Sequence, residues 1–322
     1  MQKYNELTYI NKSSIALGYF DGIHLGHKVV LKNAINIARE NSTQSTIIIF
    51  KEHPLNYLTN EKISQILTLD EKLEMLEKLG IDNVVMLDFN EFSTTTAKDY
   101  LENILIKYFS PIAITTGFNH YFGFNKEGNS KFLKENKEKY NYKYFEVPPF
   151  VMDESIVSCS VIRNMIQLGN FTQANKLLGY NYFINGTVIE GEKIARTLGF
   201  PSANIIYPES KIQIPQGVYY VRVNVQNKEY NGILNHGFAP TLNNETNLKT
   251  EVHILDFDNN IYNENIKISF ITKIRNQLKF ENKEKLIAQI NRDIAFAQIY
   301  QHFLNGYYHL DTSKFSNKKF LL

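Results

Sequence analysis

Residues 18–27 read GYFDGIHLGH, and this stretch decides the expected fold of the first half of the chain. An apolar run at Ile15–Leu17 precedes it, and a helical pattern continues from residue 28 to residue 40. A second apolar run, TIIIF at Thr46–Phe50, follows that pattern. Strand, helix and strand in this order predict a βαβ unit whose first connection is the 18–27 stretch.

Two imidazoles, His24 and His27, stand at the expected N-terminus of this helix, separated by a Leu-Gly pair. Both can point at one phosphate, because a helix N-terminus offers free N–H groups and the positive end of the helix dipole. Gly22 and Gly26 let the backbone approach closely. Adenylyl transfer needs this equipment, since an acceptor phosphate is already a nucleophile and catalysis is mainly positioning and charge neutralisation. The alternative is an ordinary pair of partly buried histidines in a turn.

The rest of the first half alternates apolar strands with helical patterns, which is typical of a parallel sheet with helices on both faces. Thr68 and Glu71 form a possible capping box before a periodic apolar face over 69–79, and Gly80 stands where a C-terminal cap belongs. Ligands of such sheets usually bind beyond the carboxyl ends of the strands. The further expected elements are strands at 84–87 and 112–116, a helix at 97–108, and a helical stretch from Pro148-Pro149 to Leu178.

The second half changes to short segments rich in Val, Ile, Tyr and Phe, separated by Gly, Asn and Asp turns. The segments YFINGTVIEG, GVYYVRVNV, TEVHILDF and ENIKISFI predict a small antiparallel barrel. Apolar residues at helical spacing predict a helix over 282–302 that packs across this barrel. We expect a first domain over 1–180, a second over 181–310 and a tail over 311–322, with the boundary near Leu178–Tyr182.

Composition narrows the class of protein. The chain has 322 residues, and 35 basic against 33 acidic side chains give a net charge of +2, too balanced for a nucleic-acid-binding protein held by bulk charge. We find no apolar run long enough to span a bilayer and no signal-peptide pattern, so we expect a cytoplasmic protein with no membrane partner. The single cysteine, Cys159, excludes an internal disulfide framework and a zinc site built from cysteines. A metal, if used, should be a hard ion held by oxygens.

The motifs of the first half resemble a known family. GYFDGIHLGH is similar to the GxFDGxHxGH signature of bacterial riboflavin kinase/FAD synthetases. Residues 50–54 (FKEHP) resemble FEPHP, residues 69–89 resemble LxEKxxxLxxLGxDxVxxxxF, residues 117–123 (GFNHYFG) resemble GxDFRFG, and residues 158–163 (SCSVIR) resemble SSTxIR. The resemblance implies a Rossmann-like nucleotidyltransferase domain with a parallel sheet, followed by a small antiparallel β-barrel riboflavin kinase domain with a terminal helix.

The same resemblance assigns roles in the first half. It makes His24 and His27 catalytic, stabilising the α-phosphate transition state. The other implied contacts are ATP-binding at Gly18, Phe20, Asp21, Gly22, Gly26, Ser158, Ser160 and Arg163, and flavin-binding at Asn119, Phe122 and Gly123. Departures from the pattern fall at Lys51, Glu52, Asn119, His120, Tyr121, Cys159 and Ser160. Two bland alternatives stand: the serines only cap the following helix, and Cys159 is a small packing residue.

Gly191–Asn204 reads GEKIARTLGFPSAN and resembles GxxxGRxLGFPTAN of the riboflavin kinase domain. A hydroxyl and an amide oxygen after a glycine-bearing loop suit Mg²⁺ that bridges nucleotide phosphates. The resemblance makes Ser202 and Asn204 the metal ligands, and places Gly191, Gly199 and Pro201 at ATP. Ala195 replaces a glycine of the pattern, which demands a negative φ there.

Thr250–Phe257 reads TEVHILDF and is close to VEVHLLDF. Alternation puts Glu251, His253 and Leu255 on one face of the expected strand, and Val252, Ile254 and Asp256 on the other. The resemblance makes Glu251 the general base that takes the proton of the ribityl 5′-hydroxyl; the alternative is a solvent-facing strand glutamate. Two other segments match the family. Asn235–Thr241 resembles the loop NIGxRPT. Arg275 and Phe280 resemble LRxExxF, with Gln277 in place of Glu, and this match implies packing and a flavin contact at Arg275.

Together these features predict a bifunctional enzyme that phosphorylates riboflavin to FMN and then adenylylates FMN to FAD, releasing pyrophosphate. Its expected substrates and products are ATP, riboflavin, FMN and FAD, with Mg²⁺ as cofactor and no protein partner implied. Three alternatives stay open: a riboflavin kinase with an inactive or weakened adenylyltransferase domain, a non-catalytic flavin- or nucleotide-binding regulator, and another small-molecule nucleotidyltransferase, which explains only the first half.

Overall fold

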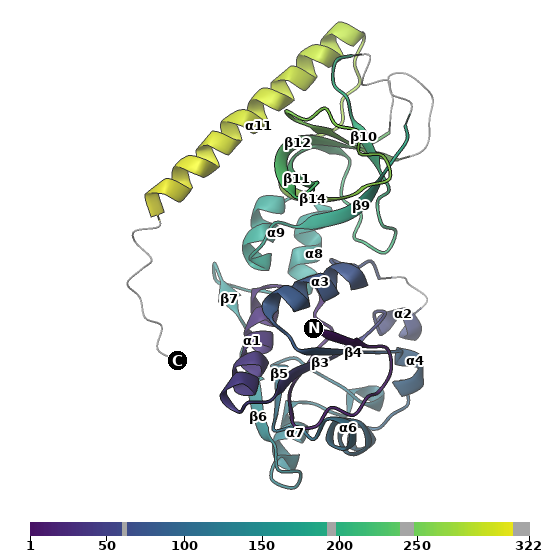
Figure 1. Ribbon diagram of the computed structural model, residues 1–322, viewed down its shortest axis with the longest axis vertical. Helices are drawn as coiled ribbons and strands as arrows, with labels where there is room; N and C mark the ends of the chain where they lie inside the picture. Colours follow the sequence, from purple (N-terminus) through teal and green to yellow (C-terminus); the bar gives the residue numbers. More distant parts are fainter. Residues whose placement is uncertain (60–62, 192–197, 239–247, 312–322) are drawn as a thin grey trace. The chain divides into compact units, whose positions relative to one another are not determined.

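The computed structural model describes residues 1–59, 63–191, 198–238 and 248–311 (Figure 1). They divide into two compact units. The N-terminal unit comprises Met1–Met165, Lys176–Tyr180 and Glu209–Gln213, and the C-terminal unit comprises Ile166–Asn175, Asn181–Pro208 and the described part of 214–322. The chain therefore passes between the units several times, and residues 209–213 belong to the N-terminal unit although they lie between strands of the other.

The N-terminal unit is built on a six-stranded parallel sheet of order β1-β4-β3-β2-β5-β6. Its strands are β1 (Gln2–Tyr4), β2 (Ser13–Leu17), β3 (Gln44–Phe50), β4 (Asn83–Leu87), β5 (Ala113–Gly117) and β6 (Lys143–Val147). From β2 the chain runs outward to β3 and β4, and then returns to place β5 on the other side of β2. The strand order reverses between β2 and β5, and this switch point is where open α/β sheets bind ligands. Residues 18–27 begin there.

Helices bury the sheet on both faces, as predicted. Every residue of β2 and β4 is buried, which a half-solvated sheet would not show. Helix α1 (Leu25–Glu40) packs on β2, β3 and β5. A helical run made of α5 (Ala97–Asp99), the π-helical η2 (Tyr100–Ile106) and α6 (Lys107–Phe109) joins α7 (Ser130–Asn136) in a core cluster with the strands. That cluster includes Ile15, Leu17, Ile48, Val85, Leu101, Leu105, Phe109, Ile114 and Leu133.

Helix α3 (Leu69–Leu79) confirms its sequence signals. The side chain of Thr68 accepts from the N–H of Glu71, the Glu71 side chain accepts from the N–H of Thr68, and Gly80 ends the helix with φ of 89°. The remaining short helices of this unit are η1 (Asp21–Ile23), α2 (Leu55–Leu58), α4 (Phe89–Phe92) and η3 (Phe124–Lys126).

The helical stretch expected directly after Pro148-Pro149 is wrong in its first part. Strands β7 (Val151–Met152) and β8 (Ser155–Ile156) form a small hairpin there. Asp153 and Glu154 at its tip both have positive φ, the backbone that a two-residue hairpin turn requires. Helices α8 (Cys159–Gln167) and α9 (Phe171–Leu178) follow it.

The C-terminal unit contains the predicted closed antiparallel barrel, in the order β10-β13-β12-β11-β14-β9. Its strands are β9 (Phe183–Ile189), β10 (Ala203–Ile205), β11 (Gly217–Val225), β12 (Lys228–Gly237), β13 (Lys249–Ile254) and β14 (Asn265–Arg275). Pairing of β10 with β9 closes the barrel. Asn235–Gly237, expected to open a loop, are instead the last residues of β12: Asn235 and His236 pair with both β11 and β13, and Gly237 pairs with β13.

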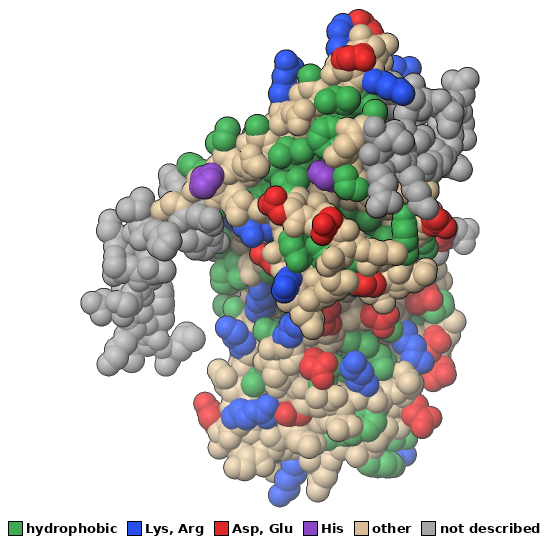
Figure 2. All heavy atoms as spheres, turned by 45° about the horizontal axis from the view of Figure 1, so that its top comes forward, with side chains coloured by type: hydrophobic (Ala, Val, Ile, Leu, Met, Phe, Trp, Pro, Cys, Tyr) green, Lys and Arg blue, Asp and Glu red, His purple; other side chains and the backbone are tan. Residues whose placement is uncertain are grey.

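Helix α11 (Lys283–Asp311) is the predicted C-terminal helix and extends beyond the expected end at residue 302. Ala297 and Ile294 pack against Val218, Tyr220 and other residues of the barrel wall, so the helix lies across the barrel as expected. No helix within the described ranges is long and apolar enough to cross a membrane. On the face that Figure 2 shows, basic and acidic side chains are interspersed.

Candidate functional site

The loop that leaves β2 has an unusual backbone. Phe20 has φ of 53°, Gly22 of 75° and Ile23 of 36°. A left-handed backbone at residues with side chains costs on the order of 1–3 kcal/mol each and is concentrated at functional sites. Burial holds it here, since Phe20 is 2% exposed and Ile23 is 0% exposed. The strained loop delivers His24 to the N-cap of α1, which begins at Leu25, so that His27 lies in its first turn.

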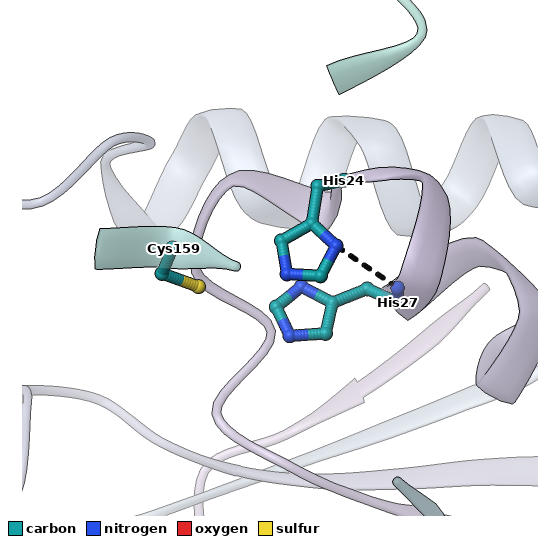
Figure 3. Close-up of side chains that lie close together, drawn as sticks. All are labelled: His24, His27 and Cys159. Atoms are coloured by element: carbon teal, nitrogen blue, oxygen red, sulfur yellow. Dashed lines mark hydrogen bonds between the residues drawn. The ribbon is translucent and has the colours of Figure 1, made fainter. Parts of the chain in front are cut away.

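His24 and His27 lie together, as predicted. Their rings stack with centroids 3.7 Å apart and planes 17° apart, and Figure 3 shows them face to face. Nδ1 of His24 accepts a hydrogen bond of 3.3 Å from the backbone N–H of His27. The neutral His24 ring therefore carries its proton on Nε2 and presents that N–H as a donor. Gly26 leaves room for this, because a Cβ there would lie 3.1 Å from Cε1 of His24.

Burial keeps both rings neutral. It lowers the pKa of His24 to about 4, and burial, followed by the nearness of His24 and Lys72, lowers the pKa of His27 well below its usual value. Near pH 7 the site thus offers neutral N–H groups at a helix N-terminus, where the dipole favours an anion. These N–H groups can donate hydrogen bonds to a phosphate that approaches the helix N-terminus.

Asp21 and Arg163, both expected to contact ATP, form an ion pair with each other. Asp21 is 2% exposed, and its carboxylate accepts from the N–H of Ile66 at 3.0 Å and of Leu67 at 3.3 Å. The Arg163 guanidinium pairs with the same carboxylate and also donates to the carbonyl of Ser64. Through this network Asp21 and Arg163 tie the loop to residues 64–67.

Lys72, Tyr19 and His53 complete the surroundings, and sequence reasoning gave none of them a role. Nζ of Lys72 donates to the carbonyl of Tyr19 at 3.0 Å and lies 3.9 Å from the centroid of its ring. Burial lowers the Lys72 pKa to about 8. The Tyr19 ring also meets the His53 ring edge-on at 4.5 Å. A lysine at the first turn of a capped helix gave no signal, because its long side chain reaches back under a loop distant in sequence.

The 158–163 segment starts α8. The N–H of Val161 donates to Oγ of Ser158 at 3.4 Å, so Ser158 caps the helix, whereas Ser160 is exposed. Sγ of Cys159 donates to the carbonyl of Asp21 at 3.2 Å, which brings Cys159 beside the histidine pair. Among the residues that the structure describes, His24, His27 and Cys159 form a group whose ligand atoms all lie within 4.8 Å of one another.

The three expected flavin contacts in the 117–123 loop lie in environments that differ from one another. Asn119 is exposed, whereas Phe122 packs with Tyr100 and other members of the sheet's core cluster. Gly123 has φ of 73°, and a Cβ there would meet the backbone N of Ala97 at 2.7 Å. His120, a departure from the family pattern, stacks on Phe122, and its buried Nε2 has no hydrogen-bond partner among the described residues.

In the C-terminal unit, three polar residues lie side by side on neighbouring strands. Glu251 on β13 is the direct Cα partner of Asn204 on β10 and of Asn235 on β12. Direct partners in antiparallel strands point to the same face. The alternation predicted for β13 holds from Thr250 to Ile254, with Glu251 partly exposed. It fails beyond, because the strand ends there and Asp256 lies exposed in a turn with φ of 56°.

Residues 201–204, which lead into β10, are held in place from two sides. Asn204 packs against Gly191, where a Cβ would lie 1.9 Å from its Nδ2, so any larger residue would displace the amide. Nδ1 of His253 bonds to the carbonyl of Pro201 at 2.7 Å. Ser202 is partly exposed and Gly199 has φ of 88°. The hydroxyl of Ser202 and the amide oxygen of Asn204 are the hard oxygen donors that Mg²⁺ prefers.

Arg275 at the end of β14 pairs with Asp293 of α11. Its Nε and Nη2 donate to the two carboxylate oxygens at 3.0 and 2.8 Å, and the Asp293 side chain is 3% exposed. Its guanidinium also lies 5.9 Å from the ring of Phe280. Nε2 of Gln277 donates to Asn235 at 2.8 Å, next to the Glu251 strand. Ala195 and the 239–241 part of the NHGFAPT segment lie outside the described residues.

Comparison with known proteins identifies both halves. The FAD synthetase family model matches residues 7–161, and the riboflavin kinase family model matches residues 178–301. The bifunctional riboflavin kinase/FMN adenylyltransferase of Buchnera aphidicola subsp. Schizaphis graminum is 35% identical over 295 residues, covering 90% of this chain and 94% of that protein. The chain belongs to this family. Both domain types are present, which favours the bifunctional interpretation over a kinase alone.

Other members of the bifunctional riboflavin kinase/FMN adenylyltransferase family match over similar lengths. The protein of Listeria monocytogenes is 36% identical, with 90% of this chain and 92% of that protein covered. The Bacillus subtilis protein is 34% identical, with 88% and 90% covered. The crystal structure of a macrolide-efflux protein from Streptococcus pneumoniae superimposes with a TM-score of 0.84 at 28% identity, covering 92% of this chain and 99% of that one.

Proposed function

We infer that this chain is an enzyme with two activities: it transfers the γ-phosphate of ATP to riboflavin, giving FMN, and then transfers AMP from a second ATP to FMN, giving FAD and pyrophosphate. The placement of Asn204 directly opposite Glu251 carries the kinase assignment. The stacked imidazoles at the N-terminus of α1 support the adenylyltransferase assignment. We place these activities in domains over 181–310 and 1–180, with a tail over 311–322.

For the kinase step we propose Glu251 as general base. Its carboxylate takes the proton of the ribityl 5′-hydroxyl as that oxygen attacks the γ-phosphorus, and ADP leaves. Ser202 and Asn204 would hold Mg²⁺, which supplies charge neutralisation on the phosphates when it is bound. The tight packing of Asn204 against Gly191 supports this, because it keeps the amide from turning. Gly199 and Pro201 are the proposed ATP contacts on the same segment.

For the adenylyl step we propose that His24 and His27 stabilise the charge that develops on the α-phosphate. The FMN phosphate is already ionised and attacks the α-phosphorus, so no base is needed, and pyrophosphate leaves. Nε2–H of His24 is a preorganised donor, because the cap bond fixes its tautomer. Positioned donors of this kind cost no reorganisation when the charge appears.

The other residues of the two sites have the following proposed roles. Gly18, Phe20, Gly22 and Gly26 shape the phosphate loop, and Ser158 and Ser160 flank it. Asp21 and Arg163 act through each other, since their ion pair holds the loop to residues 64–67. Asn119, Phe122 and Gly123 would face the isoalloxazine of FMN, and Arg275 the flavin of the kinase. We propose a cytoplasmic location and no protein or nucleic-acid partner.

A time course tests the function directly. The purified protein is incubated with riboflavin, ATP and Mg²⁺, and the flavins are separated chromatographically. We expect FMN to accumulate first and FAD to follow. FMN that never becomes FAD, even when FMN is supplied with excess ATP, would refute the adenylyltransferase half, and unchanged riboflavin would refute the kinase half.

A further inference from the structure

The side chains of His24, His27 and Cys159 converge from two segments that are far apart in the sequence. Figure 3 shows the cysteine sulfur directed toward the stacked imidazoles, and the ligand atoms of the three residues lie within 4.8 Å of one another. His24 is 6% exposed, and the other two are partly buried. The two imidazoles serve the proposed adenylyl transfer, but the sulfur has no role in that reaction, so the third member of the group calls for another explanation.

Among the residues that the structure describes, two nitrogens of this group have no hydrogen-bond partner. Nδ1 of His24 accepts from the His27 N–H, which leaves its Nε2. Nδ1 of His27 is buried with no partner in the described part of the chain. A buried nitrogen left unpaired is costly, and each such group in a folded protein calls for an explanation. A ligand that accepts lone pairs would satisfy both rings.

We propose that His24, His27 and Cys159 form a binding site for a divalent cation of the zinc class, and that this ion competes with adenylyl transfer for the two imidazoles. Two imidazoles and one thiolate are a common zinc donor set, with a fourth position left for water. Mg²⁺, by contrast, prefers oxygen donors and does not compete here. The site therefore discriminates between the ion that the reaction uses and an ion that stops it.

Binding requires modest local changes. In a tetrahedral site with ordinary Zn–N and Zn–S lengths the donors lie roughly 3.3–3.6 Å apart, so the group must contract and the stacked rings must open. The Cys159 thiol loses its proton to solvent as the S–Zn bond forms. The His24 proton moves from Nε2 to Nδ1, so that Nε2 binds the metal and the long bond from the His27 N–H is given up. The charge of the ion offsets these costs.

The sulfur ligand of this proposed site is a departure of this chain from the family pattern. The pattern SSTxIR, which residues 158–163 resemble, has a serine where Cys159 stands. A neutral hydroxyl is a poor zinc ligand beside a thiolate. Cys159→Ser is therefore the matched variant: it keeps the size of the side chain and a donor toward the Asp21 carbonyl, and it removes the sulfur alone.

The binding test needs no turnover. The full-length protein, without nucleotide, is titrated with Co²⁺, whose bond to a thiolate gives a charge-transfer absorption in the near ultraviolet. We expect one equivalent to produce this absorption, Zn²⁺ to abolish it by displacement, and Cys159→Ser to lack it. An absent band in the unsubstituted protein, or the same band in the variant, would overturn the proposal.

The functional consequence rests on the proposed roles of His24 and His27. With Mg²⁺-ATP in excess and free Zn²⁺ set by a chelator buffer, we expect Zn²⁺ to inhibit FMN adenylylation while riboflavin phosphorylation in the same tube continues. Cys159→Ser should need at least about tenfold more free Zn²⁺, because even an outer partner of a metal site contributes about 10-fold to 100-fold in affinity. Chelation of Zn²⁺ by ATP is common to both proteins and cancels in this comparison.

The outcomes separate the two ideas. Equal inhibition of the two proteins would overturn the metal site. Co²⁺ binding through Cys159 without any adenylylation in zinc-free controls that contain Mg²⁺-ATP would instead refute the proposed enzyme activity and leave the metal site standing. If Cys159→Ser lacks adenylylation before zinc is added, Cys159→Ala replaces it in the same assay.

Discussion

Asn204 and Glu251 are direct Cα partners on strands β10 and β13, so an amide proposed for the metal and a carboxylate proposed as the base share one face of the barrel. They are 47 positions apart in the sequence. The antiparallel register alone brings them together. This relationship allows a single γ-phosphate to meet both groups.

Glu251→Gln should abolish FMN formation and leave the conversion of FMN to FAD intact. Removal of a positioned general base costs about 10²-fold to 10⁴-fold in rate, and Gln keeps the shape of the side chain. The two reactions are measured separately, with riboflavin or FMN as the supplied flavin. Glu229→Gln is the control, since this glutamate on β12 is 56% exposed and pairs with Arg222 at the surface. Loss of both reactions in a folded Glu251 variant would contradict independent sites.

Replacing both His24 and His27 by Ala should have the reverse effect, with FMN accumulating and no FAD. The loss arises because the N–H donors at the α-phosphate are gone. His24→Ser separates this role from helix capping, because serine caps α1 about as well as other good N-cap residues and restores about 1 kcal/mol relative to Ala. We expect His24→Ser to melt near the unsubstituted protein yet to adenylylate FMN slowly. Full FAD formation by that variant would show that His24 only caps.

His120→Phe should stabilise the protein. Nε2 of His120 is buried and finds no partner in the part of the chain that the structure describes, and an unsatisfied buried group costs about 1–3 kcal/mol. Burial also lowers its pKa to about 4. The unfolded chain, with a His pKa near 6.5, binds more protons than the folded one between these values, so this contribution to stability is full above about pH 6.5 and declines as pH falls toward 4.

Urea unfolding at pH 7.5 and pH 5 measures both effects of His120→Phe. The variant should be more stable at pH 7.5, and its advantage should grow at pH 5. His302→Phe, at an exposed position of α11, serves as control and should change neither value. A destabilised His120→Phe would mean that the ring nitrogen has a partner in solution.

Lys211→Met should destabilise the N-terminal unit strongly. Nζ of Lys211 pairs with the Glu71 carboxylate, and their side chains are 0% and 1% exposed. Removing one partner of a buried pair leaves an uncompensated charge and costs about 3–5 kcal/mol. The double variant Lys211→Met with Glu71→Leu should recover much of that loss. Lys285→Met is the comparison, since Lys285 forms an exposed pair with Glu281 that is worth well under about 1 kcal/mol.

His253→Ala should raise the KM for Mg²⁺-ATP in the kinase reaction by roughly 10-fold, because His253 holds the Pro201 carbonyl beside the proposed metal ligands. FMN adenylylation in the same preparation should not change. Asn can place an N–H where Nδ1 of the histidine lies, so His253→Asn should restore part of the affinity. Equal kinetics of the Ala and Asn variants would indicate that the hydrogen bond does not position the segment.

Local patterns determined much of this protein. Alternating apolar runs, the capping signals at Thr68 and Gly80, and the short β segments predicted a parallel α/β half and an antiparallel barrel, and both are present. These features depend on residues close together in the chain, which is why they can be read from it. The hairpin at 151–156 escaped because its turn uses left-handed Asp153 and Glu154 rather than the usual Asn-Gly or Gly.

Only the tertiary structure decided what surrounds the predicted residues. Cys159 joins the histidine pair across more than a hundred positions, and Lys211, between two barrel strands in sequence, is buried against Glu71 within the N-terminal unit. Arg163 is engaged by Asp21, and Arg275 by Asp293. Such pairings arise from packing between segments that are distant in the sequence, and local secondary-structure propensities do not encode them. The sequence by itself determined which chemical groups are present and on which elements; the packing determined which of them meet.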